Sequence, residues 1–532
     1  MSFSDILRYI IPALSAAVLL RCALPLLLNG GRGQRTLAIL ETPQKGPIEL
    51  TSLENTVGRS LTSDIRIKSH SVAPVQGAIM GTTGGQWTVY DLKGDGAVYL
   101  RGKRVKGSAA LEDGDRIRFG TVETVFSLPA EEEEENNPRA AFMPQILLTL
   151  LIISVYLASG GAPGVLFLFA AELILSWASF FMSRLMEKPA ETETLAFLAV
   201  TLGFGAIASS DPSVCYKEAL CLAAGVLFYW GLCVLMEEPR RSELFRLPAG
   251  LLGLGLLAVA LVSAPTILGA KNWIKLGFIS FQPSELVKAA FVFAGSAPLL
   301  KTLDHRRNIA FVVFSALCVL ALAAMGDFGT ALVFFCAYLV MAFMRSGSFG
   351  TLFASVSGTV LAAFLAVLAK PYIAQRFSTW GHAWEAFNEG GYQQTRTMIA
   401  SASGGLFGLG IGQGWFKSIF AADTDMVFGL IAEEQGLICA FCAVFAILAL
   451  AASCVNTVAA SRGAFYAISS CAAATVMLTQ LALNVFGSLD ILPFTGVTFP
   501  FVSKGGTSLI ASWALLAFIK AASARWEGGS AE

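Results

Sequence analysis

Apolar runs of about 20 residues recur along this chain of 532 residues, and each is long enough to cross a bilayer as a helix. The first run covers residues 6–28, contains Arg21 and has no small-residue cleavage site, so we expect an uncleaved membrane anchor. Because 55% of the residues are hydrophobic and only 14% are charged, the composition suits lipid as the main solvent. The sequence therefore predicts a polytopic α-helical membrane protein with about 13 spans. The other predicted spans begin near Ile146, Val165, Leu195, Leu220, Leu251, Leu286, Ile309, Thr330, Leu352, Val427, Phe465 and Thr507.

Basic residues in short loops orient the predicted spans, because Lys and Arg concentrate on the cytoplasmic side of a membrane. Two such loops, residues 237–241 and 305–307, should therefore face the cytoplasm. Counting spans from these loops places residues 30–140 in the cytoplasm and the long loop of residues 370–425 outside. The same count gives a cytoplasmic C-terminus.

A polar segment, residues 30–130, separates the first apolar run from the rest. Its short strands, such as residues 87–90 and 116–119, lie between Gly and Asp turns and predict an all-β unit. The acidic run Glu131–Glu135 then opens a linker over residues 131–142, which should be a solvated spacer.

The β segment resembles the forkhead-associated (FHA) family, a β-sandwich that binds phosphothreonine peptides through loops at one end. By this resemblance the family's Ser-Arg-x-His loop falls on residues 73–76, Ala-Pro-Val-Gln, and its Asn-Gly falls on Asp95-Gly96. Arg59 is the one member of the usual phosphopeptide-binding set that is kept. We therefore expect a cytoplasmic FHA-like sandwich that docks a protein partner rather than a phosphothreonine. The motifs are Val57-Gly58-Arg59, Asp64-Ile65, Trp87-Thr88-Val89-Tyr90-Asp91-Leu92 and Leu111-Glu112-Asp113-Gly114-Asp115-Arg116-Ile117.

From about residue 190 to its end, the chain resembles the SEDS family (shape, elongation, division and sporulation), which contains RodA, FtsW and SpoVE. The resemblance implies a ten-helix core over residues 191–532, in the cytoplasmic membrane of a bacterium. The anchor of residues 1–29, the FHA-like unit and two additional transmembrane helices in residues 143–190 would then be additions. Three signatures occur in family order: Asn272-Trp273-Ile274 with Gln282–Lys288; Gly391-Tyr392-Gln393 with Gly404–Gly408, Thr424-Asp425 and Glu433–Gly436; and Gly496 with Pro500–Ser508.

The SEDS resemblance implies polymerisation of lipid II, the undecaprenyl-linked peptidoglycan precursor, with a class B penicillin-binding protein as partner. In the family an aspartate of the large outer loop is taken as the base that accepts the proton of the acceptor hydroxyl. Counting back from Gly391 without a gap places Ala386 at that position. The candidate bases are then Glu385, Glu389 and His382, in that order, because a loop can absorb a shift of one residue.

Glu285 and Lys288 stand three residues apart and therefore share one face of a helix. An ionisable pair at the start of an apolar span either lines a polar cavity, where it could bind substrate, or forms a structural ion pair. Asp327 also precedes an apolar run, and there we expect a helix N-cap.

Further substrate-binding candidates lie in the outer segments. Arg376 and Gln393 belong to the long loop, where a cation suits a lipid diphosphate. Ser503 and Lys504 belong to the last signature, in which Lys504 stands where the family usually has an aromatic residue. Asp423 similarly replaces the family's histidine before Thr424-Asp425. Both changes alter the charge of the presumed cavity mouth.

Two other functions remain open from sequence. One is a catalytically silent SEDS paralogue that acts as a scaffold or regulator of cell-wall synthases, and the other is a lipid-precursor transporter, although no convincing internal repeat supports it. The formal net charge of 0 gives no indication of nucleic acid. Cys439 and Cys442 form a C-x-x-C without a second pair, so we expect buried cysteines and no metal site there. No cofactor is indicated, and a divalent metal is left open.

Overall fold

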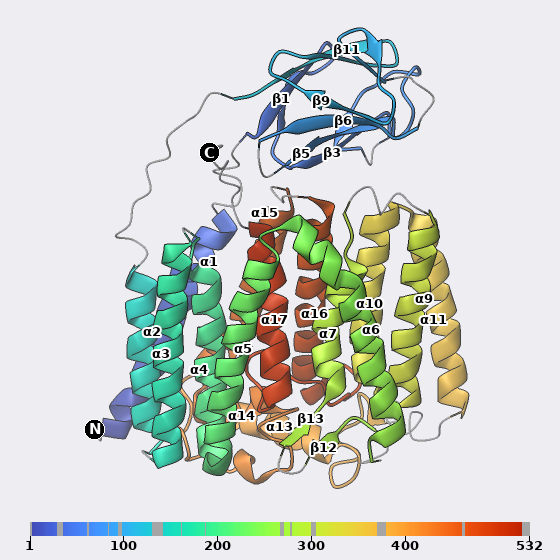
Figure 1. The fold of residues 1–532 in the computed structure, drawn as a ribbon. Coiled ribbons are helices and arrows are strands. Elements are labelled where there is room, and N and C mark those ends of the chain that lie inside the picture. The colour runs from blue at the N-terminus through green and yellow to red at the C-terminus, as the bar shows by residue number, and fades with distance from the viewer. Residues whose placement is uncertain are drawn as a thin grey trace.

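In the computed structural model, a bundle of long helices carries a small β-domain at one end (Figure 1). The colour order shows that this domain is built from the chain between the first two helices, α1 and α2. The structure describes residues 3–28, 36–60, 63–82, 85–93, 98–129, 142–160, 162–186, 188–265, 271–276, 279–298, 305–369, 379–459 and 463–523.

The β-domain consists of two packed sheets, with strand orders β2-β1-β11-β10-β7-β8 and β4-β3-β5-β6-β9. In β6 the side chains of Trp87, Val89 and Asp91 are buried and the two between them are less so, the alternation expected of a strand with one face on a core. The predicted all-β unit is thus confirmed. Its strands are β1 Ala38–Thr42, β2 Gly46–Leu50, β3 Glu54–Gly58, β4 Ile65–Arg66, β5 Gly77–Gly81, β6 Trp87–Asp91, β7 Val98–Leu100, β8 Lys103–Arg104, β9 Ser108–Leu111, β10 Arg116–Phe119 and β11 Val122–Ser127.

Within the described ranges, nine helices are long and apolar enough to cross a membrane, and three shorter apolar helices accompany them. The polytopic class is confirmed, while the number of 13 spans stays a prediction. The helices are α1 Phe3–Leu28, α2 Phe142–Ala158, α3 Pro163–Leu185, α4 Glu191–Ser210, α5 Cys215–Leu235, α6 Pro239–Ser263, α7 Pro283–Gly295, α9 His305–Ala324, α10 Phe328–Ser346, α11 Phe349–Ala369, α13 Tyr392–Gly404, α14 Val427–Glu434, α15 Leu437–Ala459, α16 Ala464–Ser488 and α17 Gly506–Ser523. A short hairpin, β12 Ile274–Leu276 and β13 Ile279–Phe281, precedes α7.

One predicted span begins later than expected. The apolar run near Val427 is divided into the short helix α14 and the long helix α15, which starts at Leu437. Gly436 separates them with a φ of +93°, and a Cβ at this position would lie 2.3 Å from the carbonyl oxygen of Leu406. Only glycine fits both the backbone conformation and this close approach, so the break is a consequence of the sequence.

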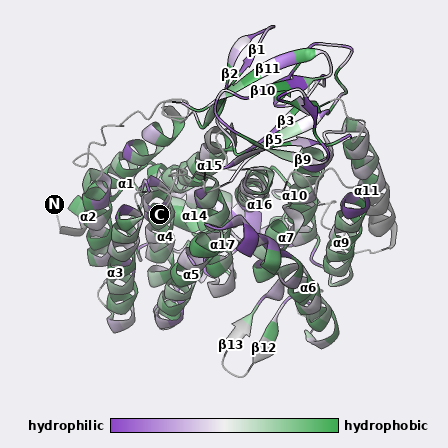
Figure 2. Ribbon diagram, turned by 45° about the horizontal axis from the view of Figure 1, so that its top comes forward, coloured by the Kyte–Doolittle hydropathy of each residue, from purple (hydrophilic) through white to green (hydrophobic). Residues whose placement is uncertain are grey.

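The three N-terminal helices pack on one side of the bundle. α1 lies against α2, α4 and α15, and α3 lies against α4 and α5. In Figure 2 these helices, like the rest of the bundle, are mostly green, whereas the β-domain carries more purple. The hydropathy pattern is that of a helical membrane protein with one polar domain.

The β-domain contacts the helix bundle through Glu54 of β3. Oε2 of Glu54 accepts a hydrogen bond from the backbone N–H of Ala464, the first residue of α16, at 2.8 Å. A Cβ at Gly463 would lie only 2.9 Å from the Glu54 carboxyl, so glycine permits this approach. A carboxylate at a helix N-terminus is stabilised by the positive end of the helix dipole.

A buried ion pair fixes α4 to α17. Nζ of Lys520 lies 2.8 Å from Oε1 of Glu193, and each side chain is 2% exposed. The carboxylate also accepts hydrogen bonds from Tyr229 (2.6 Å), Thr192 (2.7 Å) and Ser183 (2.9 Å). Both oxygens of the Glu193 carboxylate have hydrogen-bond partners, so the buried charge is compensated. The network therefore stabilises the packing of α4 against α17.

Candidate active site

Residues 379–391 form a series of turns before α13, at the end of the bundle opposite the β-domain (Figure 1). The backbone N–H groups of Glu385 and Ala386 both donate to the carbonyl oxygen of His382, at 3.0 and 3.2 Å. These turns surround a hollow of about 530 Å³. It is lined by Thr379, His382, Glu385, Ala386, Phe387, Asn388 and Glu389.

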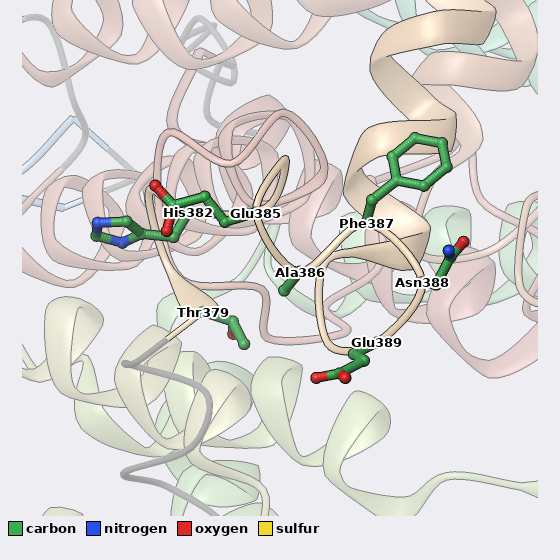
Figure 3. A pocket seen from close by; sticks show the side chains of 7 residues that line it. All are labelled: Thr379, His382, Glu385, Ala386, Phe387, Asn388 and Glu389. Carbon is green, nitrogen blue, oxygen red and sulfur yellow. The ribbon is translucent and has the colours of Figure 1, made fainter.

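Ala386 lies in this hollow between the candidate bases. Figure 3 shows Glu385 and His382 extending to one side of Ala386 and Glu389 extending to the other. All three side chains are exposed, and neither glutamate carboxylate forms a hydrogen bond with another described residue. The fold thus brings all three candidates to one hollow. Which of them accepts a proton stays a prediction.

Asp490, just beyond α16, anchors this segment. Its Oδ1 accepts from the backbone N–H of Gly381 at 3.1 Å, and its Oδ2 accepts from that of Ala383 at 3.0 Å. Trp380 adds a bond from Nε1 to the carbonyl oxygen of Ile491, at 3.0 Å. The sequence analysis missed Asp490. The one available signal was an aspartate directly after a predicted helix. Aspartate tolerates the left-handed conformation better than most residues, and Asp490 adopts it here with a φ of +61°.

Helix α13 begins directly after these turns and carries two polar side chains, of which Arg396 contacts a residue that lines the hollow. Nε2 of Gln393 donates to the carbonyl oxygen of Phe420 at 3.1 Å. The guanidinium of Arg396 lies 3.9 Å from the ring centroid of Phe387, which lines the hollow, so a cation–π contact joins the helix to the turns. Arg376, the basic candidate of this loop, lies outside the described residues.

Lys504 forms ion pairs with two aspartates. Its Nζ lies 2.8 Å from Oδ2 of Asp423 and 3.5 Å from Oδ2 of Asp211. Burial alone would lower the pKa of Lys504, but the hydrogen bond and charge of Asp423, with the charge of Asp211, raise it. The neighbouring Ser503 donates from Oγ to the carbonyl oxygen of Thr424 at 2.5 Å. The final signature is therefore bonded directly to the segment that contains Asp423.

Glu285 and Lys288 contact each other, as the sequence predicts. Nζ of Lys288 donates to Oε1 of Glu285 at 2.7 Å, and their side chains are 1% and 4% exposed. The pair is therefore enclosed by protein and does not face lipid. This geometry fits the structural ion pair, and a role in substrate binding stays a prediction.

Asp327 is confirmed as the N-cap of α10. Its Oδ1 accepts from the backbone N–H of Thr330 at 3.0 Å. Its Oδ2 accepts from the side-chain amides of Asn272, at 3.0 Å, and Gln282, at 3.3 Å. Two residues of the first SEDS-like signature thus converge on one buried aspartate, which suggests that this signature maintains the local fold.

The glycine-rich segment after α13 wraps around the end of α14. The carboxylate of Glu433 accepts from the backbone N–H of Phe416 at 2.9 Å and of Trp415 at 3.3 Å. A Cβ at Gly414 would lie 2.2 Å from Oε2 of Glu433, so a larger residue would displace the carboxylate. Burial raises the pKa of Glu433, against the effect of these hydrogen bonds.

In the β-domain, Arg59 is exposed at the end of β3. The loop that replaces Ser-Arg-x-His is closed internally, since Oε1 of Gln76 accepts from the backbone N–H of Ala73 at 3.1 Å. The predicted Asp95-Gly96 turn lies outside the described residues. Among the described residues at this end of the β-domain, Arg59 is therefore the exposed cation of the set with which the FHA family binds phosphopeptides.

Metal ligands do not gather in the described part of the chain, where no three His, Cys, Asp or Glu side chains form a cluster. Cys439 and Cys442 are free and buried within α15, as expected for cysteines that act as small apolar side chains.

Comparisons with known proteins agree with this architecture. The chain belongs to the FtsW/RodA/SpoVE family, described as cell cycle proteins, whose model matches residues 194–527. The FHA domain model matches residues 55–120. Helices α1, α2 and α3 lie outside both matches.

Two relatives carry names of enzymes. A probable peptidoglycan glycosyltransferase FtsW of Tolumonas auensis is 31% identical over 302 residues, which are 55% of this chain and 77% of the relative. The peptidoglycan glycosyltransferase RodA of Mycobacterium leprae is 26% identical over 321 residues, 57% of this chain and 68% of the relative. A solved chain from a peptidoglycan synthase complex that coordinates polymerization and crosslinking is 26% identical, with a TM-score of 0.52 over 62% of this chain and 95% of that one.

Proposed function

We propose that this protein is a SEDS-type peptidoglycan glycosyltransferase that polymerises lipid II for growth, division or sporulation. The family match over residues 194–527 carries the proposal. The names of the two relatives and the exposed hollow with its carboxylates, at the position of the family's catalytic aspartate, support it further. The hollow would then face the extracytoplasmic side and the FHA-like domain the cytoplasm.

The reaction needs one base and one site for a diphosphate leaving group. The base takes the proton of the acceptor hydroxyl, the hydroxyl oxygen bonds to the anomeric carbon of the donor, and the bond from that carbon to the diphosphate oxygen breaks. Glu385 is the first candidate base, followed by Glu389 and His382, because all three line the hollow around Ala386. Each is exposed and therefore accessible to a large acceptor.

The diphosphate requires cations or hydrogen-bond donors near this hollow. Arg376 and Gln393 are the proposed contacts from the long loop, and Lys504 and Ser503 those from the final signature. Lys504 would have to exchange Asp423 for the diphosphate, since the two are paired at 2.8 Å. Glu285 and Lys288 would act, if at all, from a more deeply buried position.

A class B penicillin-binding protein is the proposed partner, because the solved neighbour was determined within a synthase complex. The FHA-like domain would dock a cytoplasmic protein. Of the residues with which the FHA family binds phosphothreonine, the described part of this domain exposes Arg59 as a cation. This favours docking of a protein partner over recognition of a phosphothreonine.

A second function is favoured by one observation, the alanine at position 386. Alanine cannot accept a proton, so a catalytically silent member of the family could serve as a scaffold for active synthases. The distinction rests on whether a neighbouring side chain in the same hollow replaces the missing carboxylate.

Polymerisation of labelled lipid II by the purified full-length protein, with and without a class B penicillin-binding protein, tests both functions. We expect glycan strands on gels for the wild type, and a loss of about 10²–10⁴-fold in rate for Glu385→Ala if Glu385 is the base. Ala386→Asp should raise the rate, because it restores a carboxylate at the family position.

Asn388→Ala is the matched control, since Asn388 lines the same hollow and has no acid–base role at neutral pH. Activity that survives in Glu385→Ala, Glu389→Ala and His382→Ala alike would exclude all three candidate bases. An inactive wild type, with activity that appears only in Ala386→Asp, would favour the scaffold instead.

A further inference from the structure

The side chain of Asp490 bonds the candidate active-site segment to the end of the bundle. Its two carboxylate oxygens are divided between two backbone N–H groups, Gly381 at 3.1 Å and Ala383 at 3.0 Å. Both amides belong to the turns that carry His382. Gly381 precedes Glu385 by four residues and Ala383 precedes it by two. An ionised carboxylate that accepts two backbone hydrogen bonds fixes the direction of both peptide groups.

The backbone at Asp490 is itself unusual. Its φ of +61° lies in the left-handed region, which glycine adopts freely and other residues adopt at a cost. Aspartate tolerates this conformation better than most residues, but glycine would relieve it entirely. A non-glycine residue is kept in a strained conformation where its side chain makes contacts that glycine could not make. Here those contacts are the two hydrogen bonds to the turns around the hollow.

We propose that Asp490 is a positioning residue for the candidate active site: it sets the place of residues 381–389 and hence of the acid–base side chains around Ala386. This deepens the proposed function, on which its catalytic consequence rests. Asp490 does not line the hollow, so it would act through the backbone and not on the substrate. Trp380, bonded through Nε1 to the carbonyl oxygen of Ile491, adds a second attachment at the same point.

Two substitutions separate anchoring from folding. Asp490→Gly removes the carboxylate and relieves the backbone, so the thermal midpoint should stay or rise while the anchor is lost. Asp490→Asn keeps one acceptor oxygen and turns the other into a donor, so one of the two bonds should remain. Ala421→Gly is the matched control, since Ala421 has a φ of +62° on the same side of the bundle without a carboxylate to lose.

Hydrogen–deuterium exchange of peptides spanning residues 379–391, in the full-length protein in detergent, is the first measurement. We expect exchange to be roughly 10- to 100-fold faster in Asp490→Gly, because the hydrogen bonds to the carboxylate are lost. Exchange should be intermediate in Asp490→Asn and unchanged in Ala421→Gly. Exchange at the wild-type rate in Asp490→Gly would overturn the proposal.

The second measurement is the rate of lipid II polymerisation. A misplaced base should lower kcat by about 10²-fold in Asp490→Gly, with KM little changed and with partial recovery in Asp490→Asn. Faster exchange with an unaltered kcat would show that the anchor has no role in positioning. If the wild type itself does not polymerise lipid II, the proposed function fails, while the exchange experiment still decides whether Asp490 holds the segment.

Discussion

Lys504 donates a hydrogen bond from Nζ to Oδ2 of Asp423 at 2.8 Å, across 81 positions of sequence. At both of these positions the chain departs from the SEDS pattern in charge. The two departures therefore form one ion pair. Ser210 supports it by donating to the same carboxylate oxygen at 2.8 Å. The lysine at position 504 and the aspartate at position 423 are therefore explained together, because each supplies the oppositely charged partner of the other.

The first prediction is that the two positions are energetically coupled. Lys504→Met and Asp423→Asn should each lower the thermal midpoint, and the double variant should lower it by less than the sum, with a coupling of about 1 kcal/mol. The side chains are 26% and 12% exposed, so solvent screens the pair in part. Thermal unfolding of the four proteins in detergent measures the cycle, and strictly additive effects would show that the contact is idle.

The second prediction concerns pH. The raised pKa of Lys504 means that its contribution to stability is complete below its ordinary pKa of 10.5 and is lost as the pH rises through the raised value. The hydrogen bond from Ser213 and the charge of Lys504 lower the pKa of Asp211, so its contribution is present above 3.8 and is lost as the pH falls through the lowered value. The difference in midpoint between wild type and Lys504→Met should therefore be constant from about pH 5 to 9 and shrink at both extremes. A difference that varies within this window would contradict the assignment.

The third prediction concerns the buried pair of α7. Glu285→Gln leaves Lys288 charged and without its carboxylate, which should cost about 3–5 kcal/mol and reduce both the thermal midpoint and the yield of folded protein. The double variant Glu285→Leu with Lys288→Met removes both charges and should recover most of the loss. Wild-type stability in Glu285→Gln would mean that the pair is accessible to water.

The fourth prediction tests the contact between the β-domain and the bundle. Glu54→Gln weakens the bond to the N-terminus of α16 by about 0.5–1 kcal/mol, because the helix dipole no longer meets a full charge. Spin labels on the β-domain and on the bundle should then give a broader distance distribution. Glu49→Gln is the control, since Glu49 accepts from Thr36 within the same domain. Equal distributions for all three proteins would show that the contact does not restrain the domain.

The fifth prediction is topological. In a background without the native cysteines, a cysteine at the exposed position Asn388 should react with an impermeant maleimide on intact cells, and one at exposed Lys106 should not. Glycine positions are less suitable, since Gly114 has a φ of +80°. Labelling of both cysteines would contradict the proposed topology, and labelling of Lys106→Cys alone would reverse its orientation.

The sequence predicted elements governed by local patterns. Apolar length identified the membrane helices as a class, short strands between Gly and Asp turns identified the β-domain, and the three-residue spacing placed Glu285 and Lys288 on one face of a helix. The break at Gly436 was missed because its cause, the close approach of the Leu406 carbonyl, is a contact between separate segments of the chain. The polar residues Glu433, Glu434 and Gln435, just before Gly436, were the available signal in the sequence. Asp490 was missed for a similar reason. Its partners lie 107 and 109 positions away, and no local pattern indicates which backbone amides a distant carboxylate will meet.

The packing of α1 against α15 has a consequence for the order in which the protein is made. Ser15 on α1 and Cys439 on α15 approach to 3.9 Å although 424 positions separate them. The first helix therefore meets its early neighbours α2 and α4 well before α15 is made, and its contact with α15 is the last of the three to form. Completion of the α1 contact then coincides with the synthesis of α15, when α14 and the turns that precede it have already been made. The packing around α1 is thus completed only when most of the chain has been synthesised, with α16 and α17 still to follow.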